Sequence, residues 1–154
     1  MTTTAPPSEL EPRIRPAERP DLLAVFRIEQ DVFPQPWPFN AFEQYLGEPG
    51  FLVAETGAIL GYVIADVTPT HVRPIGHIKD LAVHESCQGQ GIGSALLERG
   101  LSILEGDVRA VKLEVRESNE AAISLYESHG FEYLRTIDGY YSNDEAAYVL
   151  VRDV

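Results

Sequence analysis

The sequence predicts an α/β domain whose mixed sheet is antiparallel at both ends and parallel in the middle, with about four flanking helices. Three observations support this fold class. Two apolar stretches, at 51–55 and 58–66, are joined by a turn at Gly57 and form a hairpin. Strand and helix patterns then alternate over residues 75–129, which is typical of parallel strands with crossover connections. A second hairpin ends the chain.

The elements before the first hairpin are short. A strand at 13–15 comes first, and Pro20 then suits the first turn of a helix that runs to about residue 31. Within this segment the spacing of a single helix face is followed by Leu22, Val25, Phe26 and Glu29. Prolines at 33–38 break the helix, and Gly47 ends a second short one. One side of that second helix carries Phe39, Phe42 and Leu46.

The elements after the first hairpin are longer. They are a loop at 69–74, a strand at 75–83, a helix at 91–105, a strand at 111–116, a helix at 119–129, and strands at 131–138 and 147–152 around a loop at 139–144. The helix at 91–105 carries Ile92, Leu96, Leu97 and Leu101 at the spacing of one helix face. Gly130 is expected to end the helix before it, with Phe131 packing behind.

Length and composition favour one domain at 13–154 after a flexible N-terminal tail at 1–12. Apolar residues make up 44% of the chain, which suffices for a buried core. No apolar stretch approaches the roughly 20 residues that span a bilayer, so no membrane association is expected. The first residues lack the order of a signal peptide. The single cysteine, Cys87, fits a reducing compartment, and we expect a cytoplasmic protein.

The charge is strongly negative. Twenty-four acidic residues and twelve basic residues give a net charge of −12, and the lysines are Lys79 and Lys112 alone. Nucleic acid is excluded as a partner, because phosphate binding requires a basic surface. The acidity fits either attraction to a cationic substrate or solubility in a saline cytoplasm. The acidic residues are spread along the chain, which favours the second interpretation.

A glycine-rich segment lies between a predicted strand and a predicted helix: Gln88, Gly89, Gln90, Gly91, Ile92, Gly93 and Ser94. Its glycines let the backbone turn tightly, and the N–H groups of the first helical turn favour an anion. The segment lacks the Lys-Ser/Thr pair of a nucleotide P-loop. A dinucleotide-binding fold would place an acid near Glu114, about twenty residues on, but the hairpins on both sides argue against that fold.

Two motifs resemble a known family. Gln88-x-x-Gly91-x-Gly93, after the strand Ile78-Lys79-Asp80-Leu81-Ala82-Val83, resembles the acetyl-CoA signature of the GNAT acyltransferase superfamily. The second motif is Leu113-Glu114-Val115-Arg116-x-Ser118-Asn119-x-Ala121-Ala122-Ile123-x-Leu125-Tyr126-Glu127-x-x-Gly130-Phe131. It is similar to the N-terminal protein acetyltransferases of the ribosomal-protein-alanine (RimI) type. The resemblance covers residues 13–152 and implies a GNAT-like sheet.

The resemblance implies acetyl-CoA as the co-substrate. The residues that would bind it are Leu81, Ala82, Val83, Gln88, Gly89, Gln90, Gly91, Ile92, Gly93, Ser94, Asn119 and Tyr126. In relatives the strand at 81–83 pairs with the pantetheine, and the N–H group at Val83 polarises the thioester carbonyl. Asn119 also suits a helix N-cap. No metal is expected, because the four histidines, at 71, 77, 84 and 129, lack metal-ligand spacing. We expect surface or packing roles for them.

Two residues are expected to be catalytic. Glu114 alternates with apolar neighbours along its strand, which would also suit a solvated sheet face. The resemblance implies that Glu114 deprotonates the amine and that Tyr126 approaches the CoA sulfur. A phenol near pKa ~10 is a weaker acid than a thiol near ~8.5, so Tyr126 is expected to donate a hydrogen bond rather than its proton.

Two aromatic segments are expected to bind the acceptor. Trp37 lies where relatives place an aromatic loop, although Pro38 replaces their usual serine. Tyr140 and Tyr141 lie where family tyrosines hold the substrate, and we expect only one of them to touch it. The acceptor implied is the N-terminal α-amine of a protein, most naturally a ribosomal protein. A polyamine or aminoglycoside remains an alternative, as does a non-catalytic CoA-binding regulatory domain.

Overall fold

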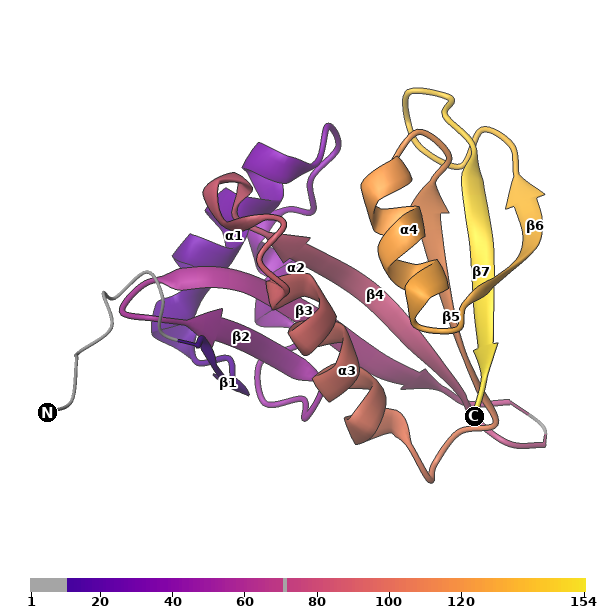
Figure 1. Ribbon diagram of the computed structural model, residues 1–154, viewed down its shortest axis with the longest axis horizontal. Coiled ribbons are helices and arrows are strands. Elements are labelled where there is room, and N and C mark those ends of the chain that lie inside the picture. Colours follow the sequence, from indigo (N-terminus) through magenta and orange to yellow (C-terminus); the bar gives the residue numbers. More distant parts are fainter. Residues whose placement is uncertain (1–10, 71) are drawn as a thin grey trace, which may run out of the picture.

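The computed structural model describes residues 11–70 and 72–154, and nearly all of the predicted tail at 1–12 lies outside them. Its elements are β1 (Arg13–Pro16), η2 (Arg19–Asp21), α1 (Leu22–Val32), α2 (Phe39–Glu43), β2 (Phe51–Glu55), β3 (Ile59–Thr68), β4 (Ile75–Val83), η3 (Glu85–Cys87), α3 (Ile92–Leu104), β5 (Ala110–Arg116), α4 (Glu120–Ser128), β6 (Glu132–Ile137) and β7 (Ala147–Asp153). Every predicted helix and strand is present (Figure 1). The short 3-10 turn η3 is an addition to the prediction.

The strands form one sheet in the order β1-β2-β3-β4-β5-β7-β6. All neighbours are antiparallel except β4 and β5, which confirms the predicted sheet with a parallel centre. The parallel strands pair only at Gly76 with Val111 and at His77 with Lys112. Beyond these positions β4 and β5 diverge, so that the sheet opens into two arms (Figure 1).

Helices cover both faces of the sheet and create two cores. On one face α1 and α2 pack over β2 and β3 around Phe42, Phe51 and Tyr62, which are almost fully buried. On the other face α3 and α4 bury Leu96 and Leu97 against the sheet. Each buried leucine of this kind contributes about 2 kcal/mol of transfer free energy. The two cores hold the arms of the sheet on either side of the opening.

An irregularity in β4 decides which side chains reach each face. The register with β3 shifts, because Ile64 pairs with Asp80 whereas Ala65 pairs with Ile78. Lys79 is therefore an extra residue in the pairing, as in a β-bulge. Ile78 belongs to the core under α3 and α4, whereas Ala82 belongs to the core under α1. The shift turns Asp80 toward α1.

Local contacts fix the ends of the elements. Arg15 ties β1 to the start of α1 through two hydrogen bonds to Asp21, of 2.8 and 3.0 Å. Asn119 caps α4 by accepting from the Ala122 N–H at 3.2 Å. Gly130 ends α4 with a φ of +86°. Within the described residues, no helix is long and apolar enough to cross a membrane.

Candidate active site

A groove of about 530 Å³ lies beside the start of α3. Gly89 and Gly91 turn the chain into it with φ angles of +80° and +85°, which residues with a side chain rarely adopt. Gly91 is the N-cap of α3, and no side chain caps the N–H groups of the first turn. Within the described chain, none of the groove's lining residues is charged. The groove therefore offers backbone N–H donors to an anion and an apolar wall to the rest of a ligand.

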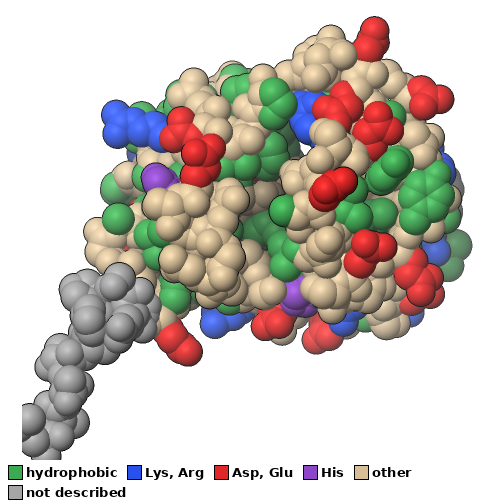
Figure 2. All heavy atoms as spheres, turned by 45° about the horizontal axis from the view of Figure 1, so that its top comes forward, with side chains coloured by type: hydrophobic (Ala, Val, Ile, Leu, Met, Phe, Trp, Pro, Cys, Tyr) green, Lys and Arg blue, Asp and Glu red, His purple; other side chains and the backbone are tan. Residues whose placement is uncertain are grey.

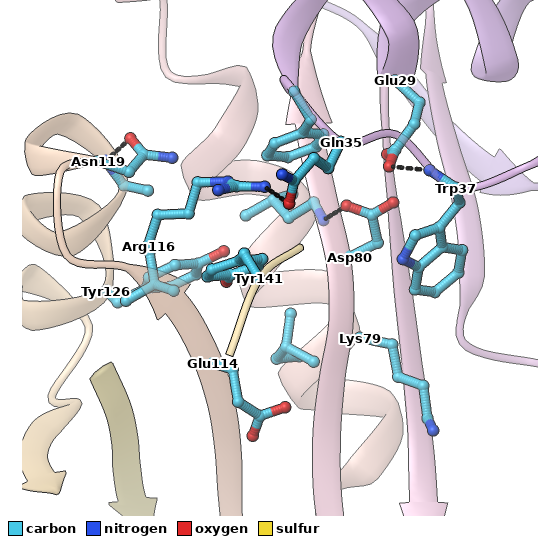
Figure 3. Close-up of a pocket in the computed structure, with 15 residues that line it drawn as sticks. Glu29, Gln35, Trp37, Lys79, Asp80, Glu114, Arg116, Asn119, Tyr126 and Tyr141 are labelled. Carbon is cyan, nitrogen blue, oxygen red and sulfur yellow. Dashed lines mark hydrogen bonds between the residues drawn. The ribbon is translucent and has the colours of Figure 1, made fainter. Parts of the chain in front are cut away.

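A second cavity of about 110 Å³ opens where β4 and β5 diverge (Figure 3). Its wall includes Glu29, Trp37, Asp80, Glu114, Arg116, Tyr126 and Tyr141. The groove and the second cavity share Phe33, Asn119 and Ala122 as lining residues. Figure 2 shows a hollow between the two halves of the molecule, with hydrophobic side chains inside and acidic side chains around it. The two spaces thus adjoin at the centre of the sheet.

Glu114 lies in the wall of the second cavity with its charge compensated. His77 Nε2 lies 2.8 Å from Glu114 Oε1, and Lys112 Nζ lies 3.8 Å from Oε2. Burial raises the pKa of Glu114, but the hydrogen bond from His77 and the charges of His77, Lys112 and Lys79 outweigh it and lower the pKa below its usual range. Glu114 is therefore an ionised carboxylate at neutral pH. Its Oε2 is buried without a hydrogen-bond partner among the described residues.

Tyr126 lies across the same cavity, on α4. Its ring packs edge-to-face on Phe131 with the ring centroids 5.8 Å apart, and the residue is only 7% exposed. Burial, followed by the negative charge of Asp80, raises the pKa of Tyr126 above its usual value. The phenol therefore keeps its proton at neutral pH and is suited to donate a hydrogen bond.

The groove at a helix N-terminus and the adjoining cavity match a known family. Residues 22–131 match the acetyltransferase (GNAT) family. The chain belongs to this family. GNAT acetyltransferases use acetyl-CoA. The left-handed glycines of the groove beside α3, and the N–H groups of the first turn of α3, fit the phosphates of such a ligand.

Individual relatives agree with the family assignment. An N-alpha-acetyltransferase of Saccharolobus solfataricus is 31% identical over 153 residues, which cover 90% of this chain and 91% of the relative. A [ribosomal protein bS18]-alanine N-acetyltransferase of Escherichia coli K12 is 37% identical over 127 residues, 80% of this chain and 83% of the relative. The crystal structure of the ribosomal-protein-S18-alanine N-acetyltransferase from Escherichia coli superposes with a TM-score of 0.78 at 31% identity, covering 93% of this chain and 94% of the other.

The predicted cofactor residues of this acetyltransferase fall into three groups. Eight line the groove: Val83, Gln88, Gly89, Gly91, Ile92, Gly93, Ser94 and Asn119. Leu81 and Tyr126 line the adjoining cavity instead. Gln90 faces a different surface pocket, and the Ala82 side chain is buried under α1. The Gln88 side chain donates to the Val83 carbonyl at 3.1 Å and so ties the loop to the end of β4.

The two predicted acceptor loops meet above the cavity. Gln35 Oε1, between α1 and α2, accepts from Arg116 Nη2 at 3.0 Å and from the Ser142 N–H at 3.1 Å. Tyr141 lines the cavity and lies under the Arg116 guanidinium, 3.8 Å from its ring centroid. Tyr140 is 47% exposed and does not line the cavity.

Trp37 also lines the second cavity, and its ring stacks on Tyr45 with the ring centroids 5.9 Å apart. Its backbone N–H donates to Glu29 Oε2 at 2.9 Å. Trp37 therefore has both a packing contact and a face toward the cavity.

Sequence reasoning missed several polar residues of this acetyltransferase site. His77 was assigned a surface or packing role, whereas it pairs with Glu114 across the divergent strands. Neither Glu29 nor Asp80 is predicted from the sequence to be a site residue. Glu29 nevertheless shares its helical spacing with apolar residues, and Asp80 interrupts an apolar strand. A charged residue at a position predicted to be buried is the signal that could have found both.

Proposed function

We propose that this acetyltransferase acetylates the N-terminal α-amine of a protein, with a ribosomal protein as the favoured target. The observation that carries the proposal is the acceptor cavity, which adjoins the acetyl-CoA groove and is bordered by two aromatic loops. Relatives whose names specify N-terminal α-amines or a ribosomal protein's alanine support it. The single cysteine favours the cytoplasm as the place of reaction.

In this proposal Glu114 takes a proton from the substrate's ammonium group, and the nitrogen then attacks the acetyl donor directly. A carboxylate with a lowered pKa is a weak base, so the acidity of the amine matters. An α-amine has a pKa near ~8 and a lysine near ~10.4, which makes deprotonation of lysine about 3 kcal/mol more costly. The charge environment of Glu114 thus favours α-amines over lysines.

The remaining roles fall to Tyr126 and to the end of β4. Acetyl-CoA supplies the acetyl group as a thioester. The Tyr126 hydroxyl donates a hydrogen bond to the departing sulfur, and its raised pKa makes it a donor rather than a full acid. The N–H group of Val83 donates to the carbonyl that takes up negative charge.

A panel of acceptors tests the function directly. The enzyme is incubated with acetyl-CoA and, separately, with peptides that have free N-termini, with free lysine and with spermidine, and acetylated products are identified by mass spectrometry. We expect acetylation at peptide α-amines and a much lower rate with lysine. Including peptides with different first residues measures how broad the specificity is.

A small polycationic amine is the second candidate acceptor, because the net charge of −12 would attract it. Acetylation of spermidine alone would overturn the proposal of a protein acceptor. Binding of acetyl-CoA without turnover of any amine would instead indicate a regulatory domain.

A further inference from the structure

Two carboxyl groups of the acceptor cavity lie together: Glu29 from α1 and Asp80 from β4 (Figure 3). The residues are 2% and 9% exposed. Tyr62 donates a hydrogen bond to Glu29 Oε1, and its oxygen lies 3.4 Å from Asp80 Oδ2. The other two oxygens accept from backbone N–H groups at 2.9 Å, Glu29 Oε2 from Trp37 and Asp80 Oδ1 from Leu81. We call Glu29 and Asp80 the carboxyl pair.

Both members of the carboxyl pair lie against the same hydroxyl group, that of Tyr62. Two carboxylates this close to one another do not ionise independently, because their like charges repel. Burial, followed by the contact with Glu29, raises the pKa of Asp80 well above its usual value. The pair therefore retains less negative charge than two separate carboxylates would, and the charge that it retains is buried.

Among the described residues the pair has no ion-pair partner, whereas Glu114 and Arg116 of the same cavity do. Glu114 pairs with His77, and Arg116 pairs with Glu145 at 3.0 Å. Across residues 11–70 and 72–154, no lysine, arginine or histidine forms an ion pair with either member of the carboxyl pair. A buried charge without a partner is unfavourable, so a cation in this cavity would be stabilised.

We infer that the carboxyl pair binds the primary ammonium group of the acceptor before its deprotonation. The inference rests on the proposed function, because the ammonium group meant is the N-terminal α-amine of a peptide. An ammonium group has three N–H donors. The cavity wall offers them the negative charge of the pair and the carboxylate of Glu114, whose Oε2 has no hydrogen-bond partner among the described residues. Glu114 then accepts the proton: the N–H bond breaks, and its electron pair stays on nitrogen for the attack.

A purely structural role gives different expectations. Glu29 holds the loop between α1 and α2 through the Trp37 N–H, so the pair also stabilises that loop. If stabilisation were its whole role, removing the charge of Asp80 would change the melting temperature but would leave discrimination between charged and neutral ligands unchanged. Ligand discrimination is therefore the decisive readout.

The test compares Asp80→Asn with a matched control, Asp66→Asn. Both aspartates lie on neighbouring strands, and both accept from the N–H of the following residue, at 2.9 Å for Asp80 and 2.7 Å for Asp66. Asp66 lies outside the cavity. Calorimetry on the full-length enzyme saturated with CoA measures two ligands: a peptide beginning with alanine, and the same peptide with a hydroxyl in place of the α-amine. Steady-state kinetics with the amine peptide completes the comparison.

The wild-type enzyme and Asp66→Asn are expected to bind the amine peptide at least tenfold more tightly than the hydroxyl peptide. Asp80→Asn should lose this preference and raise the KM of the peptide about tenfold, with the KM of acetyl-CoA changed less than twofold. A preference that survives in Asp80→Asn, or one that is absent from the wild type, overturns the inference alone. Failure of the wild type to acetylate any peptide overturns the proposed function, and this inference with it.

Discussion

At the scale of single residues, the acceptor cavity contains carboxyl groups in two different environments. Glu114 lies near His77, Lys112 and Lys79 and has a lowered pKa, whereas Asp80 is buried beside another carboxyl group and has a raised pKa. The environments thus assign different tasks to two chemically similar side chains. A compensated carboxylate can receive a proton, and an uncompensated one can hold a cation.

Glu114→Gln tests the proton-accepting role. The substitution removes the base and keeps the shape of the side chain, so kcat should fall at least a hundredfold. The loss should be greatest at low pH, where more of the amine is protonated. Because the folded pKa of Glu114 is lowered, its carboxylate stays ionised at neutral and mildly acidic pH, and the wild-type activity should follow the amine instead.

The measurement for Glu114→Gln is a pH profile of kcat together with calorimetry of CoA binding, which should be unchanged. Glu132→Gln is the matched control, because Glu132 is an exposed strand glutamate outside the cavity. Equal kinetics for wild type and Glu114→Gln would remove Glu114 from the mechanism.

The site was predictable from sequence only where a local motif exists. Glu114 and Tyr126 belong to one continuous motif, and the resemblance of that motif to the family predicted them as site residues. His77 is 37 positions before its partner, Glu114, and no local pattern connects the two. The face of the sheet on which Asp80 lies depends on a shift in strand register that the sequence does not reveal.

At the scale of elements, both ends of α3 are formed by glycines in the left-handed region. Gly91 precedes the helix with a φ of +85°, and Gly106 follows it with a φ of +89°. A Cβ at either position would meet nothing within 4 Å. The two positions therefore share the same backbone strain, but only Gly91 borders the groove.

Gly91→Ala should separate ligand binding from stability. Alanine in this backbone conformation costs about 1–2 kcal/mol, and relaxation would also turn the N–H groups of the first helical turn away from the groove. We expect Gly91→Ala and Gly106→Ala to lower the unfolding free energy similarly. Only Gly91→Ala should weaken CoA binding, by about tenfold or more.

Chemical unfolding and calorimetry with CoA measure both effects for Gly91→Ala and Gly106→Ala. The same loss of CoA affinity in both variants would show that strain in α3, rather than the groove, controls binding.

The order and type of the elements followed from the sequence, because hydrophobic periodicity and glycine positions are local signals. The predicted strand 75–83 coincides with β4. By contrast, the predicted second helix extended to Leu46, whereas α2 ends at Glu43. Leu46 still packs against the core under α1. The apolar spacing that predicted a longer helix therefore reflects the packing of Leu46 in the turn after α2.

At the scale of the whole molecule, the charge of the protein opposes its own co-substrate. The net charge is −12, and no described residue that lines the groove is basic. We therefore expect short-range N–H contacts to hold the phosphates of acetyl-CoA against a long-range repulsion.

CoA affinity should therefore improve with salt. Raising NaCl from about 0.1 M to about 1 M shortens the screening length from about 10 Å to about 3 Å, which suppresses the repulsion more than the direct contacts. Calorimetry across this range should show a falling Kd for CoA. Dephospho-CoA, with one phosphate fewer, should show a smaller change, and a steady loss of affinity with salt would contradict the expectation.

The divergence of β4 and β5 also bears on aggregation. An unpaired strand edge in solvent is a template on which other chains assemble. In this enzyme the open edge of β4 beyond His77 faces β5, and the paired positions at Gly76 and His77 close one end of the gap. The free N–H and C=O groups of β4 therefore lie inside the sheet rather than at one of its outer edges. They remain available to a ligand that enters the gap between the two strands.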